Sequence, residues 1–380
     1  MTERMDALML PLPKDWEIKT FRDISTINQG LQIPISQRLK APTEHAKFYI
    51  TIQALNNRKE FEYIKTYNES VVCHKDDILM TRTGNTGMVI TNIEGVFHNN
   101  FFKINFDRTL INKDFLVYFL SLEQTQKTIL KKAGTSTIPD LNHNDFYSLL
   151  IPLPPLNEQI AIANILSALD RYLYTLDALI LKKEGVKKAL SFELLSQRKR
   201  LKGFNQAWQR VRLGDIANYL TSNLSVEQIT QQGKIKVYDV NNFIGYTDTT
   251  FISDKPYISI VKDGSVGRVR ILPPKTNILS TMGALIANHR TTTEFLFYLL
   301  SNFDFKNFTS GSIIPHIYFK DYKEKTIFLP PLNEQSAIAN ILSALDNEIA
   351  SLKNKKRQFE NIKKALNHDL MSAKIRVLEK

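Results

Sequence analysis

One stretch of 18 residues occurs twice in this chain and constrains what the whole chain can fold into. LPPLNEQIAIANILSALD at Leu153–Asp170 returns as LPPLNEQSAIANILSALD at Leu329–Asp346, with a single difference, Ile160 against Ser336. In each copy two prolines end an extended run, and a glutamate follows in the first turn of a helix-favouring sequence. Proline has no N–H to satisfy at a helix start, and an acidic side chain is stabilised by the positive end of the helix dipole. Both stretches therefore predict the start of a helix.

Apolar residues follow each start at alternating spacings of four and three, which is the pattern of a coiled-coil seam. A helix with one apolar stripe cannot bury that stripe alone, so we expect the two helices to pair as an antiparallel coiled coil. The alternative is that each stripe covers the core of its own domain. The first seam contains Ile162, Leu166, Leu169, Leu173, Leu176, Ile180, Lys183, Lys187, Leu190 and Leu194, and the second contains Ile338, Leu342, Leu345, Ile349, Leu352, Lys356, Phe359, Ile362, Leu366 and Leu370.

The first helix has an apparent end signal. Arg198, Lys199, Arg200 and Lys202 precede Gly203. Cations are stabilised at the negative end of a helix, and glycine readily takes the left-handed conformation that closes one. This pattern predicts that the helix ends at Gly203.

The repeat extends beyond the helices. Trp16 and Asp23 match Trp208 and Asp215, and two strand-like runs flank a tight glycine turn in each half: Ile78–Thr83 and Met88–Thr91 around Gly84–Gly87, and Tyr257–Val261 and Arg268–Leu272 around Gly264–Gly267. Further apolar runs predict a strand at Phe101–Phe106 and short core helices at Asp114–Leu122 and Phe295–Asn302. We therefore expect a mixed α/β fold with four parts: globular domains at 1–152 and 204–328, and long helices at 153–203 and 329–380.

Charge and composition limit the function. Lys and Arg outnumber Asp and Glu by 50 to 38, a formal net charge of +12, which favours a polyanion as partner. The single cysteine, Cys73, rules out an intramolecular disulfide or a cysteine-based zinc cluster. No apolar run approaches the length of a membrane span, so we expect a cytoplasmic protein that makes no contact with a membrane.

These motifs resemble those of the specificity subunits of type I restriction-modification enzymes. The resemblance rests on PLPPLNEQ followed by IAxxLSxLD, twice, each after a globular piece with a glycine turn and a G-S/T-x-x-P segment at Gly134–Pro139 and Gly311–Pro315. It covers nearly the whole chain. One departure is that His316 replaces Asp140 after the proline.

The resemblance implies that each globular domain recognises one half of a split, asymmetric sequence in double-stranded DNA, with the helix pair setting the spacing. It implies modification (methyltransferase) subunits that carry S-adenosylmethionine, and restriction subunits that use ATP and Mg²⁺, so this chain itself needs no cofactor. It also implies a pseudo-twofold repeat with the chain ends close together. Two half-sites about 34 Å apart, one helical turn of DNA, would suit such an arrangement.

The candidate DNA contacts are donors and cations around the glycine turns and in the polar loops. For several of them, ordinary turn and capping roles are an equal alternative. They are Arg82, Thr83, Asn85, His98, Asn99, Asn100, Lys103, Thr135, Ser136 and His143 in the first half, and Lys262, Ser265, Arg268, Arg270, Asn288, His289, Arg290, Ser312 and His316 in the second half.

Catalytic motifs are missing from the sequence. There is no N-P-P-aromatic motif of an adenine methyltransferase, no G-x-x-x-x-G-K-S/T of an ATPase and no pair of histidines at metal-ligand spacing. We therefore expect a non-catalytic subunit. Two other functions remain open: a duplicated coiled-coil scaffold whose globular ends bind proteins, and an RNA-binding subunit. The basic composition disfavours the first, and the placement of aromatic residues in apolar runs disfavours the second.

Overall fold

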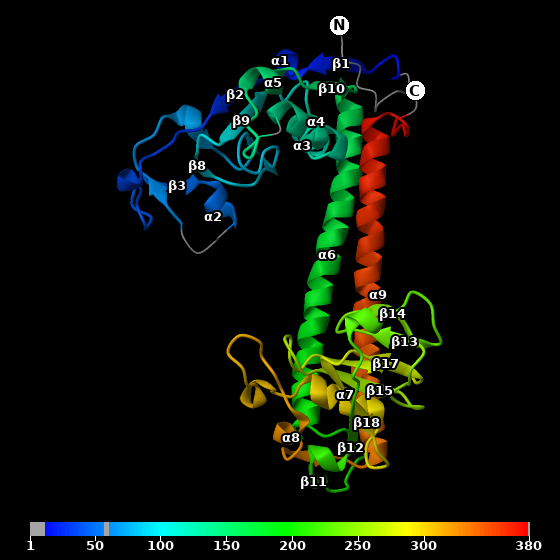
Figure 1. Ribbon diagram of the computed structural model, residues 1–380. Coiled ribbons are helices and arrows are strands. Elements are labelled where there is room, and N and C mark those ends of the chain that lie inside the picture. Colours follow the sequence, from blue (N-terminus) through cyan, green and yellow to red (C-terminus); the bar gives the residue numbers. More distant parts are fainter. Residues whose placement is uncertain (1–11, 57–60, 135, 379–380) are drawn as a thin grey trace. The chain divides into compact units, whose positions relative to one another are not determined.

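The computed structural model describes residues 12–56, 61–134 and 136–378, and Figure 1 labels its elements. These residues form two compact units. The first unit combines Met1–Thr175 with Lys356–Lys380, and the second unit is Leu176–Lys355. The division falls inside both long helices, so each unit holds one globular part and a portion of each helix.

The first unit is built on a four-stranded antiparallel sheet with the strand order β2-β9-β6-β7. A second sheet has the order β4-β3-β8-β5, and β1 pairs with β10. The strands are β1 Glu17–Thr20, β2 Ser25–Gln29, β3 Lys47–Ile50, β4 Tyr63–Ile64, β5 Val72–Cys73, β6 Ile78–Thr81, β7 Val89–Ile90, β8 Gly95–Phe97, β9 Phe101–Phe106 and β10 Leu150–Leu153. The helices are α1 Phe21–Ile24, α2 Ile52–Asn56, α3 Lys113–Leu120, α4 Glu123–Ala133 and α5 His143–Tyr147, with 3-10 turns η1 Ile35–Gln37 and η2 Glu69–Val71.

The second unit has a four-stranded antiparallel sheet with the order β12-β18-β15-β16, a three-stranded sheet β14-β13-β17 and the pair β11-β19. The strands are β11 Gln209–Arg212, β12 Ala217–Thr221, β13 Ile235–Tyr238, β14 Phe243–Thr247, β15 Tyr257–Val261, β16 Val269–Leu272, β17 Thr276–Ile278, β18 Met282–Ala287 and β19 Thr326–Leu329. The helices are α7 Thr293–Ser301 and α8 Phe319–Tyr322, with 3-10 turns η3 Leu213–Asp215, η4 Val226–Gln228 and η5 Lys306–Phe308.

The main sheets of the two units are equivalent. β6 pairs with β9 through Ile78↔Ile104 and Thr81↔Phe101, and β15 pairs with β18 in the same way through Ile258↔Leu285 and Val261↔Met282. The units differ in their smaller sheets, and α4 follows the α3 helix of the first unit where the second unit has a loop and η5. The mixed α/β duplication expected from the sequence is therefore confirmed, and it includes a sheet topology that the scattered sequence landmarks did not reveal.

The long helices are α6 Leu156–Leu195 and α9 Leu332–Met371, of 40 residues each. At 1.5 Å per residue each is about 60 Å long. Both begin directly after the paired prolines, as predicted, and the strands β10 and β19 lead into those prolines. Within each unit the two helices run antiparallel. In the first unit Asp170 pairs with Lys363, and in the second unit Asp346 pairs with Lys187.

Both interpretations of the heptad seam apply. Ile162 and Leu166 of α6 share one buried cluster with Leu370 of α9 and with the phenylalanines of the first globular part, Phe21, Phe102, Phe115, Phe119 and Phe146. In the second unit, one buried cluster likewise contains residues of both long helices, Ile338, Leu342 and Leu194, together with residues of the second globular part. The prediction was wrong at one position: Ile362 is 49% exposed, because Lys363 takes the seam position there and reaches Asp170.

The end signal at Gly203 was also misread. The helix α6 ends at Leu195, and Gln197 takes the left-handed conformation with φ 62°. The N–H of Lys199 then bonds the carbonyl of Glu193 at 3.1 Å, which closes the last turn. The second helix ends in the same way: Ala373 has φ 56°. Arg198 and Lys199 stay with their own helix, over the ring of Phe192 and beside Glu193, whereas Arg200 reaches Glu334.

Candidate nucleic-acid interface

Each long helix starts at a buried glutamate. Glu158 is 2% exposed and accepts a hydrogen bond from Nε1 of Trp16 at 3.0 Å and two from Arg376, at 2.7 Å and 2.9 Å. Arg376 also pairs with Asp15 at 3.0 Å, so the described parts of the two chain ends meet here. The bonds to Glu158 and Asp15 raise the pKa of Arg376. We call Trp16, Glu158 and Arg376 the first helix-start triad.

The second unit contains the same arrangement, the second helix-start triad of Trp208, Glu334 and Arg200. Glu334 is fully buried, accepts from Nε1 of Trp208 at 3.0 Å and receives Nη2 of Arg200 at 2.6 Å. The sequence predicted the two glutamates as first-turn acids and Arg200 as a cation of its own helix end. The structure instead gives Arg200 to the start of α9, and Arg376 to the start of α6.

Neighbouring residues of the repeated motif fasten each helix start to its globular part. Gln159 accepts from the N–H of Asn112 at 2.9 Å and donates to the carbonyls of Leu110 and Pro154. Gln335 accepts from the N–H of Thr292 at 3.0 Å and donates to the carbonyls of Arg290 and Pro330. The repeated LNEQ thus fixes each globular part to its helix, and this explains why the motif recurs unchanged.

A further repeated contact lies about four turns along each helix. Tyr118 of α3 donates to Asp170 at 2.7 Å, and Tyr298 of α7 donates to Asp346 at 2.8 Å. Burial and the adjacent carboxylate raise the pKa of both phenols. Each aspartate also pairs with a lysine of the other long helix, so one carboxylate joins three elements of its unit.

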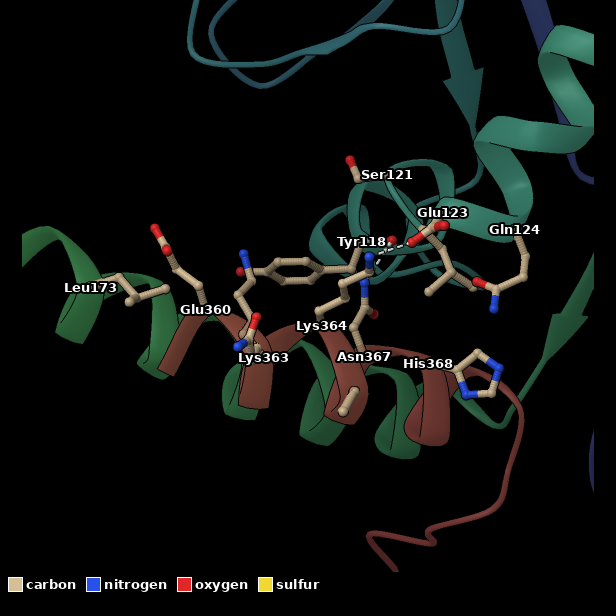
Figure 2. Close-up of a pocket in the computed structure, with 13 residues that line it drawn as sticks. Tyr118, Ser121, Glu123, Gln124, Leu173, Glu360, Lys363, Lys364, Asn367 and His368 are labelled. Carbon is tan, nitrogen blue, oxygen red and sulfur yellow. Dashed lines mark hydrogen bonds and ion pairs between the residues drawn. The ribbon is translucent and has the colours of Figure 1, made fainter. Parts of the chain in front are cut away.

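Beside Tyr118 the first unit has a hollow of about 730 Å³ between the α3–α4 corner and the last turns of α9 (Figure 2). Glu123 pairs there with Lys127 at 2.8 Å and with Lys364 at 2.6 Å, which lowers the pKa of its carboxyl to about 2. The lining carries both acids and lysines, each with an ion-pair partner, so the hollow offers no single ionic preference to a ligand.

The glycine turn of each unit is held against its return loop, by which we mean residues 134–139 in the first unit and 311–315 in the second. In the first unit the N–H of Leu141 bonds the carbonyl of Arg82 at 2.8 Å, and Thr86 donates to the carbonyl of Pro139 at 2.7 Å. In the second unit the N–H of Ile317 bonds the carbonyl of Lys262 at 2.9 Å, and the N–H of Gly264 bonds that of Pro315 at 2.9 Å. Residues remote in sequence thus form one surface in each unit.

The side-chain pair across this contact differs between the units, with the acid on opposite sides. In the first unit the cation Arg82 is on the glycine turn and Asp140 follows the return loop, with Nη2 and Oδ2 2.7 Å apart. In the second unit the acid Asp263 is on the turn, and Nδ1 of His316 follows the loop at 2.7 Å. The departure at His316 is therefore compensated by Asp263, which stands where the first unit has Thr83.

Several predicted contacts of the first unit serve the fold. Arg82 is occupied by Asp140 and lies over the ring of Phe102, and Nζ of Lys103 bonds the carbonyl of Val72 at 2.7 Å. His98 accepts the N–H of Asn100 on Nδ1, and burial lowers its pKa. Asn99 donates to Gln32, the carbonyl of Asn100 accepts from the N–H of Arg82, and the exposed ring of His143 packs on Phe102.

The remaining predicted residues of the first unit are in the turn or the return loop. Thr83 forms a bridge with Asp140, and Asn85 is exposed at the turn. Ser136 is exposed, but its hydroxyl donates to the carbonyl of Ile138 at 2.7 Å. Thr135 lies outside the described residues.

In the second unit the predicted residues fall into two groups. Lys262, exposed Ser265 and exposed Arg268 belong to the glycine turn and its flanks, beside Ser312 and His316 of the return loop and its end. The second group does not belong to this surface. Arg270 makes structural contacts: it donates to the carbonyl of Asn241 at 2.9 Å and lies over the ring of Tyr238. Asn288 donates to the carbonyl of Asp215, Arg290 donates to Gln209, and His289 between them is exposed. Asn288–Arg290 follow the far end of β18 from the glycine turn, so the structure does not bring them to it.

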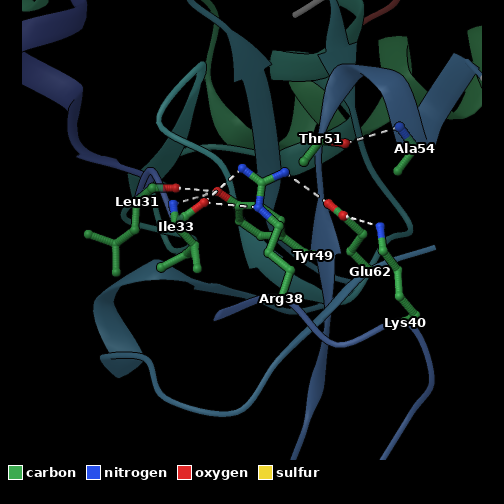
Figure 3. A network of polar contacts seen from close by, with 8 residues as sticks. All are labelled: Leu31, Ile33, Arg38, Lys40, Tyr49, Thr51, Ala54 and Glu62. Carbon is green, nitrogen blue, oxygen red and sulfur yellow. Dashed lines mark hydrogen bonds and ion pairs between the residues drawn. The ribbon is translucent and has the colours of Figure 1, made fainter. Parts of the chain in front are cut away.

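The sequence analysis missed a network that shapes the first unit (Figure 3). Arg38 donates to the carbonyl of Ile33 at 2.7 Å and to Glu62 at 2.9 Å, and its guanidinium lies over the ring of Tyr49. The pKa of the Glu62 carboxyl is lowered overall. Burial alone would raise it, but the hydrogen bonds to Lys40 and Arg38 outweigh burial. The network orders the loop around η1, whose Ile35 is 73% exposed. No local sequence signal connects Arg38 to Glu62.

Across the described part of the chain, no cluster of three or more His, Cys, Asp or Glu side chains could hold a metal ion. Burial raises the pKa of the Cys73 thiol to about 12. Within residues 12–56, 61–134 and 136–378, none of the helices has the length and apolar character needed to cross a membrane.

The repeated unit, with its globular part fastened to the start of a long helix and a paired turn and loop on its surface, defines a duplicated two-unit α/β protein. The family model described as the type I restriction modification DNA specificity domain matches residues 13–183 and again residues 205–361. The chain belongs to this family.

Known relatives extend over the full length. The type I restriction enzyme MjaVIII specificity subunit of Methanocaldococcus jannaschii is 24% identical over 410 residues, covering 97% of this chain and 95% of that protein. The putative MjaX specificity subunit of the same organism is 27% identical, covering 96% and 95%. A crystal structure of an S subunit from M. genitalium matches with a TM-score of 0.63 and 20% identity, covering 95% of this chain and 98% of that one. At that identity the structural match shows a shared fold.

Proposed function

We propose that this chain is the DNA specificity subunit of a type I restriction-modification complex and recognises a bipartite, asymmetric target in double-stranded DNA. The observation that carries the proposal is the paired glycine turn and return loop, which both units build on the same sheet register and equip with different side chains. Two domains that recognise two different half-sites are expected to share a backbone fold and to differ in their surface side chains. The formal charge of +12 supports a polyanionic partner.

The proposed parts are recognition domains at 1–152 and 204–328 and helical spacers at 153–203 and 329–380. Methyltransferase and restriction subunits would assemble on this scaffold, and S-adenosylmethionine, ATP and Mg²⁺ would belong to them. The relatives support this, because they are named as specificity subunits of type I restriction enzymes. One similar structure comes from work on complex assembly of the type I R-M system, with a TM-score of 0.59 and 16% identity. The subunit itself would be non-catalytic and cytoplasmic.

The test is long-read sequencing of adenine methylation in cells that express the chain with its methyltransferase partner, compared with cells that lack the chain. We expect one new split, asymmetric motif that depends on the chain. A soluble complex with the partner that leaves methylation unchanged would contradict DNA recognition. That outcome would favour the second candidate function, a duplicated coiled-coil scaffold whose globular ends bind proteins.

A further inference from the structure

Backbone hydrogen bonds join the two ends of each return loop. The N–H of Asp140 bonds the carbonyl of Ala133 at 3.1 Å and closes the first loop. Ser310 and His316 exchange two backbone hydrogen bonds, at 2.9 Å and 2.7 Å, and close the second. Gly311 takes φ 91°, and a Cβ there would lie 2.4 Å from the carbonyl oxygen of Ile314. The contacts to the glycine turns, described above, fix both loops further.

Each loop exposes isoleucine at its tip. Ile313 is 93% exposed and Ile314 is 54% exposed in the second unit, and Ile138 is 65% exposed in the first. Isoleucine is usually buried, and here exposed isoleucine occurs in the return loops of both units. Ile138 and Ile314 each precede the proline of their loop, and Ile313 is the more exposed neighbour of Ile314. Two nearby polar side chains are turned to internal bonds: Ser136 to the carbonyl of Ile138, and His316 to Asp263. The tips therefore present apolar surface on a fixed frame.

Lysines lie close to both loops in the sequence. Lys131 and Lys132 are in the last turn of α4, immediately before the first loop, and Lys306 and Lys320 flank the second loop in sequence. A protein partner would be expected to cover an apolar patch of larger extent, whereas an isolated apolar side chain among cations suits a groove between two phosphate backbones. The charge pattern thus points to duplex DNA as the occupant.

We propose that the return-loop tips are apolar wedges: Ile138 in the first unit and Ile313 in the second enter a DNA groove, press on a base step and partly unstack it. This inference rests on the proposed function and adds how the domains deform their half-sites. DNA-bending proteins use Ile, Leu, Phe, Met and Pro side chains in this way. A distorted step would also lower the cost of extruding a nearby base for methylation.

The experiment uses the full chain co-purified with its methyltransferase subunits and a duplex carrying the motif found by methylation sequencing. 2-Aminopurine replaces adenines one at a time, and its fluorescence reports unstacking. We expect a rise at one position in each half-site. Ile313→Ser should abolish the rise in one half only and weaken binding about tenfold, and Ile138→Ser should act on the other half. The control is Val226→Ser, because Val226 is 65% exposed and belongs to η4, outside the return loops in sequence.

The outcomes separate the wedge from the proposed function. Sequence-specific binding with no fluorescence rise, or with a rise that survives Ile313→Ser, overturns the wedge and leaves DNA recognition intact. Loss of the methyltransferase subunits from the Ile313→Ser complex also overturns it, since the tip would then bind protein. Absence of specific binding by the wild-type complex contradicts the proposed function itself. An unchanged melting temperature of the Ile313→Ser complex confirms that the variant is folded.

Discussion

At Glu158 and Glu334 a carboxylate is withdrawn from water and given a tryptophan N–H and an arginine as compensation. Burying a charge is costly unless its hydrogen bonds and countercharge are supplied. The two triads supply both, and they explain why the repeat keeps tryptophan before each globular part and arginine after each long helix. In each triad the arginine follows the C-terminal end of the other long helix. The triads therefore form only when the two helices pair antiparallel.

Glu334→Gln is expected to destabilise the second unit by about 3 kcal/mol, because it removes the countercharge of Arg200 at a buried site. Urea unfolding followed by tryptophan fluorescence measures this in a Trp16→Phe background, which leaves Trp208 as the only tryptophan. Glu348→Gln is the matched control. Its pair with Lys183 is partly exposed to solvent, so the expected loss is below about 1 kcal/mol. Equal losses in the two variants would show that the triad contributes no more than a surface ion pair.

The two arginines after the second glycine turn have opposite environments. Arg268 is exposed, whereas Arg270 is tied to Asn241 and Tyr238. Arg268→Ala is expected to reduce the salt dependence of DNA binding by about one unit of slope and to leave the melting temperature unchanged. Arg270→Ala should lower the melting temperature instead. Titration of labelled DNA at several salt concentrations, with thermal melting, distinguishes them. An unchanged slope in Arg268→Ala removes Arg268 from the contact surface.

At the scale of elements, the sequence predicted what depends on local signals. The proline pairs located both helix starts, and Phe101–Phe106 and Tyr257–Val261 were predicted with their observed bounds as β9 and β15. The partners of polar side chains depend on tertiary contacts and could not be predicted. Arg82 finds Asp140 across 58 residues, so a basic residue beside a glycine turn looked like a DNA contact. The exposed isoleucines were missed for the converse reason, because an apolar residue in sequence suggests a core.

The side-chain pair with its acid on opposite sides in the two units predicts a rescue experiment. His316→Asp places two carboxylates side by side and should loosen the return loop, whereas adding Asp263→Thr recreates the first unit's arrangement, in which Lys262 takes the place of Arg82. We expect the double variant to recover about 1 kcal/mol relative to the sum of the single variants. Hydrogen exchange at the amides of Gly264 and Ile317 measures the loop directly.

The mirror cycle is the control. Asp140→His should loosen the first loop, and Thr83→Asp should restore it. Additive effects in both cycles would mean that these pairs do not hold the loops.

At the scale of the whole molecule, the two copies of the repeat agree in some parts and differ in others. The helix starts and their fastening residues are nearly identical in the two units, while the small sheets and loops differ. Exchanging residues 16–150 for the corresponding part of a relative should therefore change one half of the methylated motif and keep the other half. Methylation sequencing of the chimaera measures this. A change in both halves would show that the domains do not read independently.

The origin of Arg376 has a consequence for how the protein is made. The second unit, Leu176–Lys355, is contiguous, so a ribosome has delivered all of it before the chain is finished. The first unit starts earlier but needs Leu370, Met371 and Arg376 to cover its core and its buried glutamate. During synthesis the first unit is thus begun first and completed last. Until the end of α9 is made, the apolar face of α6 in this unit stays uncovered. A chain that stops short of Arg376 leaves Glu158 without its countercharge, and quality control could recognise such a chain by its unfinished first half.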